Sequence, residues 1–307
     1  MQMNHKIIWS LAVTCLMLGS CNPDKSVKNE RISIVTTTGM IGDAAERVAG
    51  NVAEVISLIG PGVDPHLYKA SQGDLEKLTG ADIIFYNGLH LEGKMGEVLE
   101  KLGRLKAVIA VTKDIPDTLL RTAPGFAGAH DPHIWFDVSL WKNTVITIRN
   151  ELSVRYPLYD SVFRSNAARH LQELDSLHNE VIENISKLPP EKRVLITAHD
   201  AFGYFGDAYH IEVRGLQGIS TLSEFGLRDV TDLVNFITER KIKAIFVESS
   251  VSPKSIQAVI DGCRKKNWEV SIGGILYSDA MGPEGTPEGT YPGMVRANVK
   301  IITEALK

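Results

Sequence analysis

The chain has 307 residues, of which 44% are hydrophobic, and its formal net charge is −4. Nucleic-acid-binding domains usually carry a net positive charge, whereas this chain is mildly acidic. DNA and RNA are therefore excluded as first hypotheses for a partner. The apolar fraction is enough for a large buried core, and at about 150 residues per domain the length suggests two domains.

The first 20 residues are typical of a secretory signal peptide. Lys6 precedes an apolar stretch, residues 7–19, which is followed by Ser20 and Cys21. A transmembrane helix needs about 20 apolar residues, so this stretch is too short and residues 1–20 are interpreted as a cleaved signal. The small residues before Cys21 resemble a bacterial lipobox, in which the cysteine becomes the lipidated N-terminus. An ordinary signal peptide with an incidental cysteine is the alternative.

Residues 21–30 are polar and without periodicity, so we expect Cys21 and the residues after it to form a flexible tether to a membrane surface. Because Cys15 would leave with the signal peptide and Cys21 would carry the lipid, Cys263 would be left alone and no disulfide within the chain is expected. Cys263 follows apolar residues at helical spacing. This favours a buried thiol over a catalytic nucleophile.

Short β-branched runs alternate with helical patterns through the rest of the chain. Strand, helix and strand in succession predict parallel sheets with crossover helices. The predicted strands comprise residues 31–37, 52–59, 82–87 and 107–112 in the first half, and 193–197, 212–217, 244–247 and 269–275 in the second. Residues 282–293, which are rich in glycine and proline, are expected to form a loop.

A single long helix is predicted between the two halves. Apolar residues at spacings of three, four or seven run from about residue 158 to 188 and stop at Pro189 and Pro190. Such a helix would be roughly 45 Å long, which favours a rigid connector over an ordinary crossover helix within one large sheet. The predicted α/β fold therefore has an N-terminal lobe (31–156), a connector helix (157–190) and a C-terminal lobe (191–307).

Four polar residues follow predicted strands, where ligands bind in open α/β sheets. His66 and His133 each lie in an Asp-Pro-His sequence, and His199 and Asp279 follow strands of the second half. Each is weak evidence alone, since single loop histidines and aspartates mostly form hydrogen bonds, turns or caps. Together, three imidazoles and a carboxylate suit Zn²⁺ or Mn²⁺ better than Ca²⁺ or Cu(I).

Three further carboxylates are candidates for orienting these side chains. Asp64 and Asp131 precede the two prolines, and each either accepts a proton from the other ring nitrogen of its histidine or forms an Asx-turn. Glu248 follows a predicted strand and either lies beside the site or caps a helix ahead of Pro253. The sequence leaves these alternatives open.

The motifs around these residues resemble those of the metal-specific substrate-binding proteins of bacterial ABC transporters, the zinc and manganese binders of the ZnuA and TroA type. The resemblance covers residues 31–306 and rests on the stretches DPHLY, NGLHLE, DPHIWFD, TAHDAFGYF, GLQGISTLSE and YSDAMG. It implies two lobes joined by one long helix. The ligand set it implies, for one Zn²⁺ or Mn²⁺ per chain between the lobes, is His66, His133, His199 and Asp279.

The same resemblance implies an extracytoplasmic lipoprotein, in a periplasm or on the outer face of the cell membrane, which passes its metal to a membrane permease. A separate ATPase would drive transport, because the sequence has no Walker A motif. A monomer is the default expectation for such a delivery protein.

The identity of the metal stays open. Residues 112–129 lack the histidines that are common in the zinc-specific branch of the family, whereas a third histidine ligand favours zinc over manganese.

Two other functions are considered, a zinc-dependent hydrolase and a surface adhesin lipoprotein. Four protein ligands leave no open position for a catalytic water, and neither HExxH nor GxSxG occurs, so we expect no enzyme activity. The sequence offers no positive feature for cell adhesion.

Overall fold

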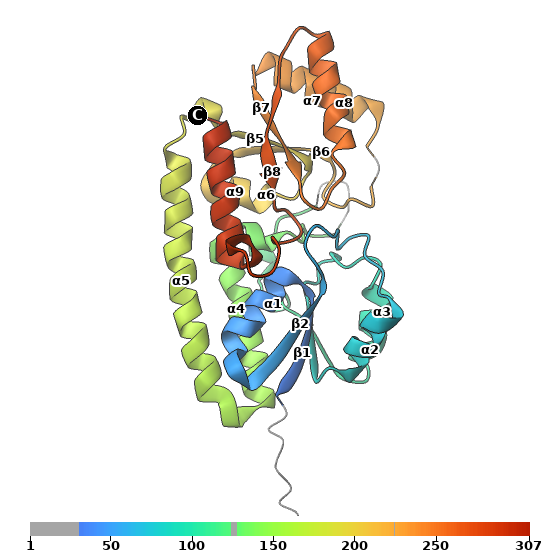
Figure 1. Cartoon of the computed structure of the whole chain (residues 1–307), viewed down its shortest axis with the longest axis vertical. Helices are drawn as coiled ribbons and strands as arrows, with labels where there is room; N and C mark the ends of the chain where they lie inside the picture. The colour runs from blue at the N-terminus through green and yellow to red at the C-terminus, as the bar shows by residue number, and fades with distance from the viewer. Residues whose placement is uncertain (1–30, 124–127, 224) are drawn as a thin grey trace, which may run out of the picture. The chain divides into compact units, whose positions relative to one another are not determined.

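The structure is a computed structural model that describes residues 31–123, 128–223 and 225–307 (Figure 1). The predicted signal peptide, the predicted lipidation site Cys21 and the predicted tether lie outside the described residues. None of the described helices combines the length and the hydropathy needed to cross a membrane.

The first half of the described chain forms a four-stranded parallel sheet in the order β2-β1-β3-β4. Side chains alternate between its two faces: Ile34 of β1 packs with the core around α1, whereas its neighbour Val35 packs with Leu78 of α2. The elements of this lobe are β1 (Ile32–Thr38), α1 (Gly39–Ala49), β2 (Ala53–Ile59), α2 (Gln72–Gly80), β3 (Ile83–Tyr86), α3 (Gly96–Gly103) and β4 (Ala107–Ala110).

The second half contains two pairs of parallel strands, β5 with β6 and β7 with β8, and β5 lies beside β7. Helices α7 and α8 cover these strands with an apolar core that includes Leu233, Val259 and the fully buried Cys263. Burial raises the pKa of the Cys263 thiol. The elements are β5 (Val194–His199), α6 (Gly203–Tyr209), β6 (Glu212–Gln217), α7 (Leu227–Glu239), β7 (Ala244–Glu248), α8 (Lys254–Lys265) and β8 (Ser271–Leu276).

One long helix, α5 (Asp160–Ser186), packs against elements of both lobes (Figure 1). It begins after a short turn that Pro157 opens, and Pro189 and Pro190 follow its end. Its buried side chains recur every three or four residues and face α1 and α4 (Val138–Arg155) near one end and α6 and α9 (Tyr291–Ala305) further along. The predicted α/β class, with two lobes and a connecting helix, is therefore confirmed.

The glycine- and proline-rich segment 282–293 differs from the predicted loop at its end. Helix α9 begins at Tyr291, so Pro292 lies in its first turn. Proline is tolerated there because the first N–H groups of a helix have no partner within it. The Thr290 hydroxyl caps the helix by accepting from the N–H of Gly293 at 3.2 Å.

Candidate metal centre

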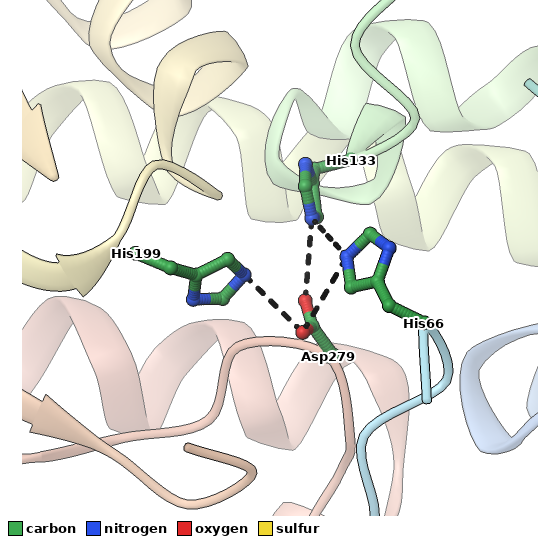
Figure 2. Close-up of side chains that lie close together, drawn as sticks. All are labelled: His66, His133, His199 and Asp279. Atoms are coloured by element: carbon green, nitrogen blue, oxygen red, sulfur yellow. Dashed lines mark hydrogen bonds and ion pairs between the residues drawn. The ribbon is translucent and has the colours of Figure 1, made fainter. Parts of the chain in front are cut away.

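Four side chains from four separate segments converge between the lobes (Figure 2). His66 lies in the loop after β2, His133 lies between β4 and α4, His199 ends β5, and Asp279 follows β8. All four are buried, with His66 1% exposed and the others 0%. One nitrogen or oxygen from each lies within 4.8 Å of those from the other three.

The facing atoms are the Nε2 nitrogens and the carboxylate oxygens of Asp279. The Nε2 atoms of His66 and His133 are 3.3 Å apart. Asp279 Oδ1 lies 3.5 Å from Nε2 of His133, and Asp279 Oδ2 lies 3.2 Å from Nε2 of His199 and 4.0 Å from Nε2 of His66. Donors at about 2.0–2.1 Å from a tetrahedral Zn²⁺ are about 3.3 Å from one another, so the observed separations suit one ion.

Several polar atoms of this cluster have no hydrogen-bond partner within the described residues. They include both carboxylate oxygens of Asp279 and the Nε2 of His199. Buried polar atoms without partners are costly in a folded protein, and a cation at their centre would satisfy them together. The donor set therefore fits a divalent metal ion.

Asp131 orients the ring of His133. Its Oδ1 accepts from the backbone N–H of His133 at 2.9 Å and lies 2.7 Å from Nδ1 of the same residue. A carboxylate at Nδ1 keeps the ring proton there and leaves the lone pair on Nε2, which is the form that binds metal. Asp131 thus combines the two alternatives that the sequence left open.

Glu248 has the same relation to His199. Its Oε1 accepts from the backbone N–H of His199 at 2.9 Å, and its Oε2 lies 2.5 Å from Nδ1. Helix α8 begins after Pro253 with no side-chain cap. The structure therefore places Glu248 beside the cluster rather than at the start of that helix.

Asp64 does not contact the ring of His66. Its Oδ1 accepts from the backbone N–H of His66 at 2.8 Å, which is the Asx-turn alternative, and its Oδ2 accepts from the hydroxyl of Thr221 at 2.6 Å. The Nδ1 atom of His66 has no partner within the described parts of the chain.

Burial and the charges within the cluster shift the pKa values of three of its members. Burial lowers the pKa of His66 to about 3. Burial alone would raise the pKa of Asp279, but the neighbouring histidines, His199 first, hold it well below its usual value. Burial alone would also lower the pKa of His199, but Glu248 and Asp279 raise it well above 6.5. In the metal-free protein these carboxylates therefore favour the protonated form of the His199 ring.

The other described histidines do not contribute to the cluster. His90 and His210 are exposed, and the ring of His130 lies 3.9 Å from Asp117. On α5, His170 lies 3.1 Å from Glu173, and Nδ1 of His178 lies 3.2 Å from the hydroxyl of Tyr209.

Sequence reasoning missed the hydrogen bonds that support the segment before His133. Glu92 of the NGLHLE stretch is buried and accepts from the Thr37 hydroxyl at 2.7 Å and from the backbone N–H of Asn87 at 2.6 Å. The Asn87 amide donates in turn to the carbonyl of Pro132 at 3.0 Å. The signal in the sequence is an acidic residue next to apolar ones, and this pattern does not indicate which groups donate hydrogen bonds to it.

Comparisons with known proteins identify the family of this chain. The family described as "Zinc-uptake complex component A periplasmic" matches residues 34–305. The manganese-binding lipoprotein MntA of Bacillus subtilis is 48% identical over 99% of this chain and 100% of its own length. The zinc-binding protein TroA of Treponema pallidum is 47% identical over 89% of this chain and 88% of its own length.

A solved structure of the periplasmic zinc-binding protein TroA from Treponema pallidum has the same fold. It matches with a TM-score of 0.87 and 46% identity, covering 90% of this chain and 99% of that one. The family match extends across both lobes and includes all four converging residues. The chain therefore belongs to the ZnuA family of zinc-uptake components.

Proposed function

We propose that the protein is the extracytoplasmic substrate-binding component of an ABC transporter, which captures one Zn²⁺ or Mn²⁺ and delivers it to a membrane permease driven by a separate ATPase. The observation that carries the proposal is the buried convergence of three Nε2 atoms and a carboxylate from both lobes. The names of the relatives MntA and TroA, for manganese and zinc respectively, support it.

In this proposal His66, His133, His199 and Asp279 bind the ion, and Asp131 and Glu248 orient two of the rings. One carboxylate and three neutral imidazoles leave the centre with a charge of +1 when a dication binds, which the nearby carboxylates Asp131 and Glu248 offset. The ion is the cargo and has no catalytic role.

The similarity to relatives does not select the metal, because MntA and TroA are almost equally identical to this chain and are named for different metals. The donor atoms of the four residues distinguish between Zn²⁺ and Mn²⁺ more clearly. Zn²⁺ accepts four ligands with nitrogen among them, and it binds a given site more tightly than Mn²⁺ in the general order of affinities. We therefore infer tighter binding of Zn²⁺, while the supply of each metal decides the cargo in the cell.

Lipidation at Cys21 would tether the protein to the membrane surface through residues 22–30, and the name of MntA as a lipoprotein supports this anchor. The protein would act as a monomer.

A hydrolase is disfavoured by the same geometry. Four protein donors fill a tetrahedral site, whereas catalytic zinc keeps one position for water.

Elemental analysis of purified residues 22–307 after loading with Zn²⁺ tests the proposal. We expect one equivalent of zinc in the wild type and in His178→Ala, whose ring lies outside the cluster, and a loss of bound zinc in His133→Ala. A wild type that binds no stoichiometric zinc or manganese would contradict the proposed function.

A further inference from the structure

A hydrogen bond outside the metal centre joins the C-terminal lobe to the loop between β2 and α2 that carries His66, which is called the His66 arm. The Thr221 hydroxyl donates to Oδ2 of Asp64 at 2.6 Å, and Oδ1 of Asp64 accepts from the backbone N–H of His66 at 2.8 Å. One carboxylate therefore connects a residue of the cluster in the first lobe to a loop of the second.

That loop, residues 218–223, is called the strap here. It begins after Gln217, the last residue of β6, which pairs in register with His199. The side-chain amide of Gln217 donates to the carbonyl of Thr221 at 2.8 Å and to that of Ser223. The position of Thr221 is therefore fixed from the strand that lies beside His199.

Leu222 of the strap lies near Gly93 of the first lobe. A Cβ added at Gly93 would be 3.2 Å from Cδ1 of Leu222, whose side chain is 44% exposed, whereas Ile219 of the strap is buried. Within the described part of the chain, the Thr221 hydroxyl makes the hydrogen bond that links the strap to the first lobe.

His66 depends on this support more than the other two histidines do. Asp131 and Glu248 lie against the Nδ1 atoms of His133 and His199, whereas Nδ1 of His66 has no partner within the described residues. Outside the cluster, the hydrogen bond described for His66 is the one that its backbone N–H donates to Asp64.

We propose that Thr221 and Asp64 form a latch that positions His66, and that opening of the strap frees the His66 arm and lets the ion leave. This inference rests on the proposed function. Thr221 and Asp64 act as positioning residues, because neither is among the four converging residues and both act through His66.

The test is the rate at which Zn²⁺ passes from the loaded protein to an excess of chelator in a stopped-flow instrument. Thr221→Val removes the hydroxyl and keeps the size of the side chain, so we expect dissociation about tenfold faster, the effect of one hydrogen bond to a charged acceptor. Thr221→Ser keeps the hydroxyl and should restore the slow rate. Thr303→Val is the matched control, because its hydroxyl donates to the Val299 carbonyl within α9.

A double-mutant cycle separates the latch from a general loss of structure. Because Asp64→Ala already removes the acceptor, adding Thr221→Val should not speed dissociation further. If the two substitutions increased the dissociation rate additively, or if Thr221→Val dissociated at the wild-type rate, the latch would be overturned. If Asp64→Ala does not fold, the comparison of Thr221→Val with Thr221→Ser decides the question by itself. A wild type that binds zinc with no response to Thr221→Val contradicts only the latch, whereas a wild type without zinc contradicts the proposed function.

Discussion

Glu248 contacts both the backbone and the ring of His199. One carboxylate oxygen accepts from the His199 N–H at 2.9 Å and the other lies 2.5 Å from Nδ1, with both side chains fully buried. The two residues end the neighbouring strands β7 and β5. Because β5 and β7 lie beside each other in the C-terminal lobe, Glu248 reaches the ring of His199 and orients Nε2 toward the cluster.

Loss of this carboxylate should weaken zinc binding. Glu248→Gln keeps the shape but loses the charge that favours a proton on Nδ1, so we expect a decrease of about 10- to 100-fold in Zn²⁺ affinity in a competition titration. Glu239→Gln, at the exposed end of α7, is the control and should bind as the wild type does. Unchanged affinity in Glu248→Gln would show that Glu248 does not orient the ligand.

Zinc binding should release a proton. Glu248 and Asp279 raise the pKa of His199, whereas its proposed role as a ligand requires a neutral ring, so we expect binding to displace that proton at pH 7. Affinity should therefore rise with pH up to the raised pKa, by about tenfold per pH unit for one proton. Calorimetry in buffers of different ionisation enthalpy should show about one proton released per Zn²⁺ at pH 7. Binding enthalpies that do not depend on the buffer would contradict this account.

Metal removal should lower the thermal stability of the protein. The proposed ligands come from both lobes and meet at one ion only in the folded state. At a Zn²⁺ concentration of 100 times the dissociation constant, binding would add about 2.7 kcal/mol to the free energy of unfolding. For a protein of this size we expect an increase in Tm of about 5–10 °C on adding Zn²⁺. The same addition should leave the Tm of His133→Ala unchanged, and an equal shift in that variant would place the stabilising ion elsewhere.

The buried carboxylate of Glu92 should contribute to folding stability. Burial raises its pKa, and the Thr37 hydroxyl and two backbone N–H groups donate to it. Glu92→Gln turns one acceptor oxygen into a donor that faces other donors, so we expect a loss of about 1–3 kcal/mol in urea unfolding. Glu97→Gln, on an exposed side chain, should unfold as the wild type does. Equal stability of the two variants would mean that these hydrogen bonds contribute nothing.

The sequence predicted the strands and the long helix well, because both rest on the local periodicity of apolar residues. The prediction of a loop is wrong at residues 291–293, which begin helix α9, because proline fits the first turn of a helix as well as a loop.

The contacts around the candidate site were less predictable. Asp64 and Asp131 occupy the same Asp-Pro-His motif, yet only Asp131 reaches the ring of its histidine. Asp64 instead uses its second oxygen to accept from Thr221, 157 residues away along the chain. The choice between these arrangements depends on the opposite lobe, and no pattern within the motif contains that information.

The most direct test of the central claim is a crystal structure of the zinc-loaded protein with anomalous diffraction recorded at the zinc edge. The account predicts one peak about 2.0–2.1 Å from the Nε2 atoms of His66, His133 and His199 and beside the carboxylate of Asp279. A zinc peak at any other position, with these four side chains free of metal, would contradict it.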